Sequence, residues 1–253
     1  MTVLAGCSSS GTPSAAAPTS TASSVAPTST STAPPTTTTS VPPPTTTTAL
    51  VVAPVPAPVT PVPGKALAVG QKGPDVQQLQ QRLTEMGYWL PGVDGSYSAA
   101  TQHAVTAFQK ANGLPRSGKA DAATLAAMAT APRPTPAKPP VAGRTIEVDL
   151  QRQILMVINN GQVENVLDVS SGKPSTPTPP GDYTIQRQID GMRVSDLGEL
   201  WRPKYFTGGY ALHGSPSVPT NAASHGCVRL TNAEIDWLWS SGVAPVGTPL
   251  SVY

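Results

Sequence analysis

From Ser8 to Gly64 the sequence consists almost entirely of Pro, Thr, Ser, Ala and Val, as in "TSTSTAPPTTTTSVPPPTTTT". This composition lacks the large apolar and aromatic side chains whose burial would offset the entropy lost when a backbone is ordered. Its prolines favour extended, polyproline-II-like conformations. We therefore expect residues 8–64 to form a disordered stalk, and the folded domains to follow it.

Charge and cysteine content exclude several classes of protein. The net charge is only +2, 12% of the residues are charged and no cluster of Lys and Arg is present, so we expect no nucleic-acid partner. No stretch reaches the roughly eighteen consecutive apolar residues of a membrane-spanning helix. The two cysteines, Cys7 and Cys227, lie on either side of the stalk and are too few for a disulfide framework. We expect them to be unpaired and to have separate roles.

Helical periodicity begins after the stalk and extends over residues 65–131. In "GPDVQQLQQRLTEMGYW" apolar residues recur at helical spacing, and Gly87 is a natural helix stop. Ser98 is a good N-cap for a second helix, and Asp121 for a third, shorter one. The segment therefore predicts a small three-helix bundle. Its expected apolar positions are Val76, Leu79, Leu83, Met86, Ala104, Ala107, Phe108 and Ala111.

The succession "VGQKGPDVQQLQQRLTEMGYW", "DGSYSAATQHAVTAFQKANGL" and "SGKADAATLAAM" resembles the peptidoglycan-binding domain 1 family. The resemblance spans the whole bundle and implies non-catalytic binding of cell-wall glycopeptide. His103 lies on the second helix, and we interpret it as a surface or half-buried histidine because no second metal ligand follows at i+4.

A Pro-rich linker, "PRPTPAKPP" within residues 132–143, is expected to separate the bundle from a C-terminal domain over residues 144–253. There, "TIEVDL" alternates in polarity and "ILMVI" is a continuous apolar run, so both predict strands, the second buried on both faces. Thr231 and Glu234 fit a capping box at the start of one helix. We expect a mostly-β domain, either a sandwich or a partly closed barrel.

Cys227 lies near two of the three histidines, His213 and His225. A thiol of ordinary pKa is only a few per cent thiolate near neutral pH, so a nucleophilic cysteine needs a nearby base. The consecutive N–H groups of Gly226 and Cys227 are suited to hold an oxyanion. Two other interpretations are open: a small buried hydrophobic cysteine, and a zinc site of His213, His225 and Cys227. Polar and glycine neighbours disfavour the first, and the absence of paired ligand spacing disfavours the second.

The stretch "ALHGSPSVPTNAASHGCVRLTN" resembles the active-site motif of the L,D-transpeptidase (YkuD) family, and "VSSGKPSTPTPPGDYTI" matches that family's Thr-Pro-x-Gly-x-Tyr region. The resemblance implies that Cys227 is the nucleophile, that His213 is the general base, and that the Gly214 carbonyl orients its ring. The other residues implied are His225 and Ser224, which shape the site, Ser224 also as a substrate-binding residue. Gly226 with Cys227 would donate to an oxyanion, and Arg229 would be a substrate ligand or part of a structural ion pair. Four aromatic residues before His213 are expected either to line the donor groove, Tyr210 above all, or to pack the sandwich; they are Trp201, Tyr205, Phe206 and Tyr210.

By this likeness the protein is expected to be a peptidoglycan L,D-transpeptidase. Its partners would be a donor tetrapeptide stem, an amine acceptor that yields a 3→3 cross-link, and wall glycan bound by the helical bundle. No metal or organic cofactor is implied. The alternatives are an L,D-carboxypeptidase, which uses water as acceptor, protein anchoring to the wall, and a non-catalytic wall-binding lipoprotein.

Leu4, Ala5, Gly6 and Cys7 have the form of a bacterial lipobox, which resembles the signal that directs lipidation of a cysteine. Only three residues precede the box, so the basic and apolar regions of such a signal are expected in a longer reading frame or to have been trimmed. The resemblance predicts an exported protein of the cell wall, tethered to the membrane through lipid on Cys7.

Overall fold

The computed structural model describes residues 65–195 and 198–253, which lie in the compact unit Ala53–Tyr253. The expectations for Cys7 and for the stalk of residues 8–64 fall outside the described residues. Within the described part, no helix has the length and apolar character needed to cross a bilayer.

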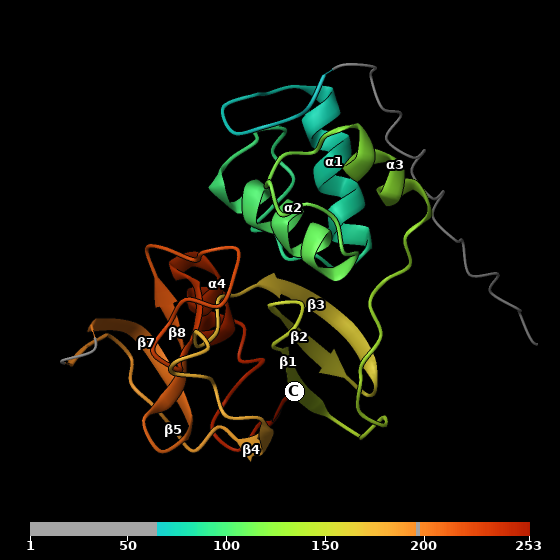
Figure 1. The fold of residues 1–253 in the computed structure, drawn as a ribbon. Coiled ribbons are helices and arrows are strands. Elements are labelled where there is room, and N and C mark those ends of the chain that lie inside the picture. The colour runs from blue at the N-terminus through green and yellow to red at the C-terminus, as the bar shows by residue number, and fades with distance from the viewer. Residues whose placement is uncertain (1–64, 196–197) are drawn as a thin grey trace, which may run out of the picture. The chain divides into compact units, whose positions relative to one another are not determined.

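The helical module contains α1 (Pro74–Glu85), α2 (Ala99–Ala111) and α3 (Ala122–Thr130), drawn in blue-green to green in Figure 1. The helices begin where the sequence predicts. The Ser98 side chain accepts a hydrogen bond from the N–H of Thr101, and the Asp121 side chain accepts one from the N–H of Thr124. Gly87, at a φ of 86°, follows the end of α1. The predicted three-helix bundle is confirmed.

The C-terminal domain consists of two five-stranded sheets with one hydrophobic core between them (Figure 1). The first has the order β3-β2-β1-β10-β4; in the second, β5, β7, β8 and β9 follow one another and β6 also pairs with β7. Neither sheet closes on itself, so the sandwich interpretation holds and the partly closed barrel is wrong. The strands are β1 (Arg144–Asp149), β2 (Ile154–Asn159), β3 (Gln162–Asp168), β4 (Gly181–Thr184), β5 (Arg187–Gln188), β6 (Met192–Ser195), β7 (Gly198–Thr207), β8 (Tyr210–Ser215), β9 (Val228–Thr231) and β10 (Pro249–Val252).

The helix α4 (Asn232–Ser240) directly follows β9 and packs against β8. Its first turn carries the predicted capping box: Glu234 Oε2 accepts from the N–H of Thr231, and Thr231 Oγ1 accepts from the N–H of Glu234. Ile235 and Leu238 are buried in the core between the sheets. The cap therefore fixes the point at which the chain turns away from β9.

The Pro-rich linker does not keep the helical module apart from the sandwich, contrary to the sequence-based expectation. Ile154, Met156 and Ile158 of β2 belong to the same core as the apolar side chains of α1 and α2, whereas Leu155 and Val157 point into the core between the sheets. Because successive side chains in a strand alternate between faces, "ILMVI" is apolar throughout in order to face two cores.

A buried ion pair links the module to the end of β3. Lys110 Nζ lies 2.5 Å from Asp168 Oδ1 and donates a second hydrogen bond to the carbonyl of Val169, at 2.7 Å. The other oxygen of Asp168 lies 2.7 Å from His103 Nδ1. The Lys110 and Asp168 side chains are 0% and 1% exposed. Burial lowers the pKa of Lys110 despite the opposing charge of Asp168.

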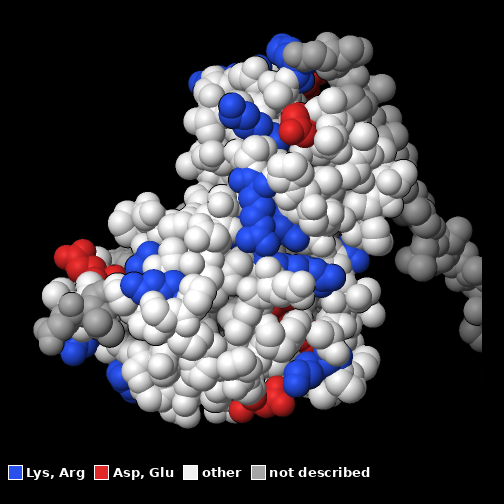
Figure 2. Space-filling view, viewed as in Figure 1, with Lys and Arg blue, Asp and Glu red and all other residues white. Residues whose placement is uncertain are grey.

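Uncharged side chains cover most of the face drawn in Figure 2, where several Lys and Arg side chains lie close together near the middle of the view and others are scattered towards its edges. This distribution agrees with a chain in which 12% of the residues are charged. A ligand on this face therefore meets mainly uncharged side chains.

Replacing Lys110 by Met should destabilise the described unit by about 3–5 kcal/mol, because Asp168 would stay buried with its strongest partner removed. Urea denaturation of the full chain would measure the change in the free energy of unfolding. The double variant Lys110→Met, Asp168→Leu should be less destabilised than Lys110→Met alone. As a control, Lys138→Met removes the exposed pair with Asp182 and should leave the denaturation midpoint unchanged. Equal midpoints for Lys110→Met and the wild type would contradict the assignment.

Candidate active site

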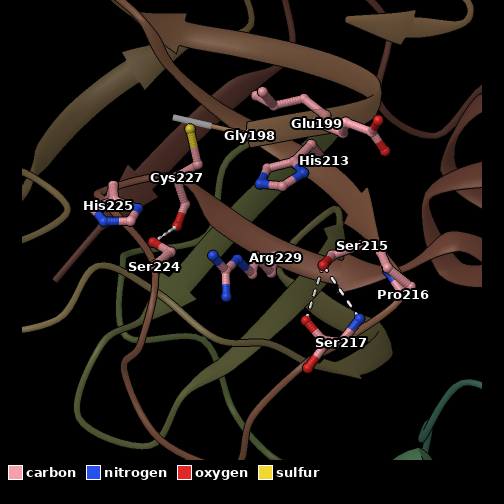
Figure 3. Close-up of a pocket in the computed structure, with 11 residues that line it drawn as sticks. Gly198, Glu199, His213, Ser215, Pro216, Ser217, Ser224, His225, Cys227 and Arg229 are labelled. Carbon is pink, nitrogen blue, oxygen red and sulfur yellow. Dashed lines mark hydrogen bonds between the residues drawn. The ribbon is translucent and has the colours of Figure 1, made fainter. Parts of the chain in front are cut away.

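Cys227, His213 and Arg229 line one pocket of about 360 Å³, and Figure 3 shows their side chains around the same hollow. The pocket therefore brings together the side chains that the sequence analysis singled out in the segment from His213 to Arg229. The remaining lining residues are Gly198, Glu199, Leu200, Ser215, Pro216, Ser217, Ser224 and His225.

The parallel pair β8–β9 positions the site. His213 of β8 is the register partner of Arg229 of β9, and Cys227 immediately precedes β9. The loop that connects the strands is braced by the segment after β3, in which Ser170 exchanges two backbone hydrogen bonds with Arg229 and the Ser171 carbonyl accepts from the N–H of Ser224. Cys227 therefore lies at the start of a strand that is hydrogen-bonded to β8 along one edge and to Ser170 along the other.

The His213 ring has a defined tautomer. Its Nδ1 lies 2.9 Å from the carbonyl oxygen of Gly214, and a carbonyl oxygen only accepts hydrogen bonds, so Nδ1 carries a proton. In the neutral ring, Nε2 is then the unprotonated nitrogen and can accept a proton. This is the geometry in which the Gly214 carbonyl orients the imidazole.

Burial disfavours charge on both members of the Cys227–His213 pair. It raises the pKa of the Cys227 thiol, although Arg229 and a backbone hydrogen bond from Ala211 act in the opposite direction. It lowers the pKa of His213, which the Arg229 charge lowers further and the hydrogen bond to Gly214 opposes. In the free protein near neutral pH the pair is therefore a thiol beside a neutral imidazole, and the thiol donates to the Gly209 carbonyl at 3.8 Å.

The Ser224 hydroxyl forms hydrogen bonds within the turn that contains Cys227. Its hydroxyl donates to the carbonyl of Cys227 at 2.5 Å, drawn as a dashed line in Figure 3, and accepts from the N–H of Gly226 at 3.0 Å. The residue is 1% exposed. Its hydroxyl hydrogen is thus used within the turn, so Ser224 shapes the site, and the expectation that it binds substrate gains no support from this geometry.

The two expected oxyanion donors differ in availability. The N–H of Gly226 is already engaged by Ser224, so this residue is not a free donor as the sequence led us to expect. Across residues 65–195 and 198–253, no hydrogen-bond acceptor is found for the N–H of Cys227. The Cys227 N–H is therefore the donor that the turn offers to a ligand.

Tyr210 packs against the turn and does not line the pocket. A Cβ atom added to Gly226 would lie 2.3 Å from Tyr210 Cε1, and Gly226 has a φ of 116°, so this position requires glycine on both counts. Trp201 donates to Asp236 at 2.8 Å and Phe206 is fully buried. The aromatic residues before His213 therefore pack the domain, and the expectation that Tyr210 binds substrate is not supported by its position.

His225 and Arg229 both reach the pocket but differ in their surroundings. His225 is exposed, and Figure 3 shows its ring on the far side of Cys227 from His213. Arg229 forms no ion pair within the described part of the chain, so the structural ion pair considered above is not found there. Its guanidinium is available to a ligand.

The zinc interpretation has no support in the described residues, among which no three His, Cys, Asp or Glu side chains gather so as to hold a metal ion.

One wall of the pocket was missed by sequence reasoning. Gly198, Glu199 and Leu200 come from the start of β7, whereas Ser215 ends β8 and Pro216 and Ser217 follow it. The segment of β7 carries no motif and contributes through its place in the sheet. Residues 215–217 lie inside the stretch quoted above around the active-site motif, and their position directly after His213 is the sequence signal that could have indicated them.

Residues 143–252 match the L,D-transpeptidase catalytic domain family, YkuD, and residues 72–128 match the peptidoglycan binding domain family. The crystal structure of the L,D-transpeptidase from Xylanimonas cellulosilytica is 45% identical to the chain, with a TM-score of 0.72, and the match covers 77% of this chain and 100% of that one. The chain belongs to the L,D-transpeptidase family. A second L,D-transpeptidase structure, from Stackebrandtia nassauensis, is 26% identical with a TM-score of 0.45 and covers 77% of this chain and 97% of that one. No curated protein sequence matches the chain.

This L,D-transpeptidase is an acyltransferase that acts on peptidoglycan, and its family uses a cysteine nucleophile. Cys227 is the free cysteine of the described residues and lies in the catalytic domain. The same chain also contains a peptidoglycan-binding domain, which precedes the catalytic domain.

Alkylation of Cys227 by iodoacetamide should have a midpoint above the ordinary thiol pKa of about 8.5, because burial raises the pKa of this thiol. The rate would be followed from pH 6 to 10 by mass spectrometry of the Cys227 peptide, which separates this thiol from Cys7. Arg229→Gln should move the midpoint further upward, since the guanidinium favours the thiolate. A rate already at its plateau below pH 7 would instead indicate a preformed thiolate–imidazolium pair.

Proposed function

We propose that this L,D-transpeptidase forms 3→3 cross-links in peptidoglycan through a thioester on Cys227. The observation that carries the proposal is the shared pocket of Cys227 and His213, together with the hydrogen bond that leaves His213 Nε2 unprotonated. The activity of the family supports the reaction class, and the position of the residues supports the assignment of roles.

In the first step, Cys227 Sγ attacks the carbonyl carbon of the diaminopimelate residue at stem position three, while His213 Nε2 accepts the thiol proton. Because both groups are neutral at rest, proton transfer accompanies the attack. The bond between this carbon and the nitrogen of the terminal D-alanine then breaks, and His213 returns the proton to the departing amine. The product is a thioester on Cys227 and free D-alanine.

In the second step, the side-chain amine of a diaminopimelate residue in another stem attacks the thioester carbonyl. His213 Nε2 accepts a proton from this amine, the bond from Sγ to carbon breaks, and the thiolate is reprotonated. An amide bond replaces the thioester, so no metal or organic cofactor is required. In both steps the Cys227 N–H would stabilise the negative charge on the carbonyl oxygen.

Arg229 is the proposed ligand for a substrate carboxylate. Its guanidinium lines the pocket between His213 and the turn of Ser224, and no acidic side chain of the described residues neutralises it. Guanidinium groups bind carboxylates through paired hydrogen bonds, which fix orientation as well as supply attraction. The exposed His225 would contribute to the rim of the same pocket.

The full chain incubated with a disaccharide-tetrapeptide should produce a 3→3 dimer, detected by mass spectrometry, and Cys227→Ala should abolish the product. Formation of tripeptide alone would show that water is the acceptor and that the protein is an L,D-carboxypeptidase. Unchanged substrate and no adduct on the wild-type protein would contradict both assignments and favour a wall-binding protein without catalysis. Thermal unfolding of the Cys227→Ala variant serves as the control for its fold.

We further propose that the protein is exported and anchored by lipid on Cys7, with the helical module holding it near wall glycan. The support is the sequence Leu4-Ala5-Gly6-Cys7 and the match of residues 72–128 to the peptidoglycan binding domain family. Such tethering raises the local concentration of substrate at the active site.

If this is correct, the protein expressed with its complete signal region in a bacterium should incorporate a palmitate analogue and fractionate with membranes. Cys7→Ser should abolish both, whereas Cys227→Ala should abolish neither. Label that persists in the Cys7→Ser variant would overturn the anchoring proposal.

A further inference from the structure

A second pocket, of about 220 Å³, adjoins the active-site pocket. The two share Ser215, the last residue of the strand of His213, and Pro216, which follows it. Its other walls come from the N-terminal part of α2 (Ala99, Ala100 and His103), from the start of α4 (Thr231, Asn232 and Ala233) and from Val218. The helical module thus contributes residues to a hollow that shares two lining residues with the active-site pocket.

Several contacts join the helical module to the catalytic domain near this second pocket. Arg116 of the module donates to the carbonyls of Thr220, at 2.8 Å, and Gln151, at 3.3 Å, both in the catalytic domain. The buried pair of Lys110 with Asp168 and the shared core of the module with β2 hold the same junction. The pocket is therefore a feature of the packed structure and does not depend on a single side chain.

His103 is the titratable side chain of this second pocket. Its Nδ1 is bonded to Asp168, and within the described residues no partner is found for Nε2. Every buried side-chain nitrogen and oxygen described has a partner, so Nε2 must be accessible to solvent. Burial opposes protonation of the ring, but the hydrogen bond and charge of Asp168 outweigh it and raise the pKa of His103. In its protonated form the ring can donate from Nε2 to a carbonyl or carboxylate oxygen, whereas the neutral ring, which holds its proton on Nδ1 beside Asp168, can only accept there.

The route between the pockets starts on the His213 side of the site. His213 and Ser215 are two residues apart in β8 and line the same pocket, as expected for one face of a strand. In the proposed reaction, His213 protonates the departing amine and deprotonates the incoming one, so both amines occupy its side of Cys227. A stem peptide that brings the incoming amine must extend away from this side.

We propose that the pocket between α2 and α4 is the acceptor subsite, which binds the carboxylate-bearing stem peptide that supplies the attacking amine. This inference rests on the proposed function, since it assigns the second substrate of the same reaction. His103 would donate to a carbonyl or carboxylate of that peptide, and the small side chains of Ala99 and Ala233 leave room for its backbone. The peptidoglycan-binding module would then take part directly in the choice of acceptor.

The test measures transfer to a disaccharide-tripeptide, which lacks the fourth residue and can act only as acceptor, with a fixed concentration of tetrapeptide donor. Ala99→Trp fills the pocket and should raise the half-saturating acceptor concentration about tenfold or more, comparable to the loss of one good hydrogen bond to a charged group. The matched control is Ala122→Trp, which makes the same change at the first residue of α3, also exposed but outside the pocket.

Two further readouts separate an effect on the acceptor from damage to the site. Transfer to glycinamide, an amine too small to reach the second pocket, should be equal in Ala99→Trp and the wild type. The rate of Cys227 alkylation should also be unchanged. Equal half-saturating acceptor concentrations for Ala99→Trp and Ala122→Trp would overturn the acceptor subsite and leave the proposed function standing. An equal loss of transfer to tripeptide and to glycinamide in Ala99→Trp would have the same meaning. If the wild type forms a 3→3 dimer with neither tetrapeptide nor tripeptide as acceptor, the proposed function itself fails, and this inference fails with it.

Discussion

The ion pair of Lys110 with Asp168 lies where three parts of the molecule meet. Asp168 is the last residue of β3, and the chain that follows it through Ser170 and Ser171 forms the brace on which Arg229 and the turn before Cys227 are hydrogen-bonded. A pair of buried charges tolerates little displacement, because each loses its partner in a medium of low dielectric constant. The contact of Lys110 Nζ with Asp168 Oδ1 therefore links α2 directly to the segment that braces the catalytic turn.

The resting chemistry of the site follows from burial. Burial raises the pKa of Cys227 and lowers that of His213, so both residues favour their neutral forms. The nucleophile therefore remains a neutral thiol until a substrate carbonyl is present. Arg229, opposite His213 in the β8–β9 register, acts on both residues by favouring the thiolate and disfavouring the imidazolium. A bound carboxylate would neutralise this guanidinium, so substrate binding itself would shift the balance of the pair towards a more basic His213.

The sequence was sufficient to predict the helix starts and to single out Cys227 and His213, which line one pocket, but not their three-dimensional neighbours. Ser98, Asp121 and the Thr231–Glu234 box define helix starts locally, and the stretch Ser-His-Gly-Cys that ends at Cys227 can be seen without any knowledge of the fold. The engagement of the Gly226 N–H by Ser224 depends on the shape of one turn, and the exclusion of Tyr210 from the pocket depends on its contact with Gly226. The contact between the module and the sandwich was not predicted, because a proline-rich linker indicates separate domains. The sequence feature that indicates this contact is the run of apolar residues on both faces of β2.

That pattern in β2 has a consequence for how the two parts can be exchanged. Ile154, Met156 and Ile158 meet the helices at positions where a strand that faced water would carry polar side chains. With these apolar residues in place, the sandwich without its module would expose an apolar strand face to water. A different module joined to this catalytic domain would therefore have to supply a complementary apolar surface, or the strand would have to change with it.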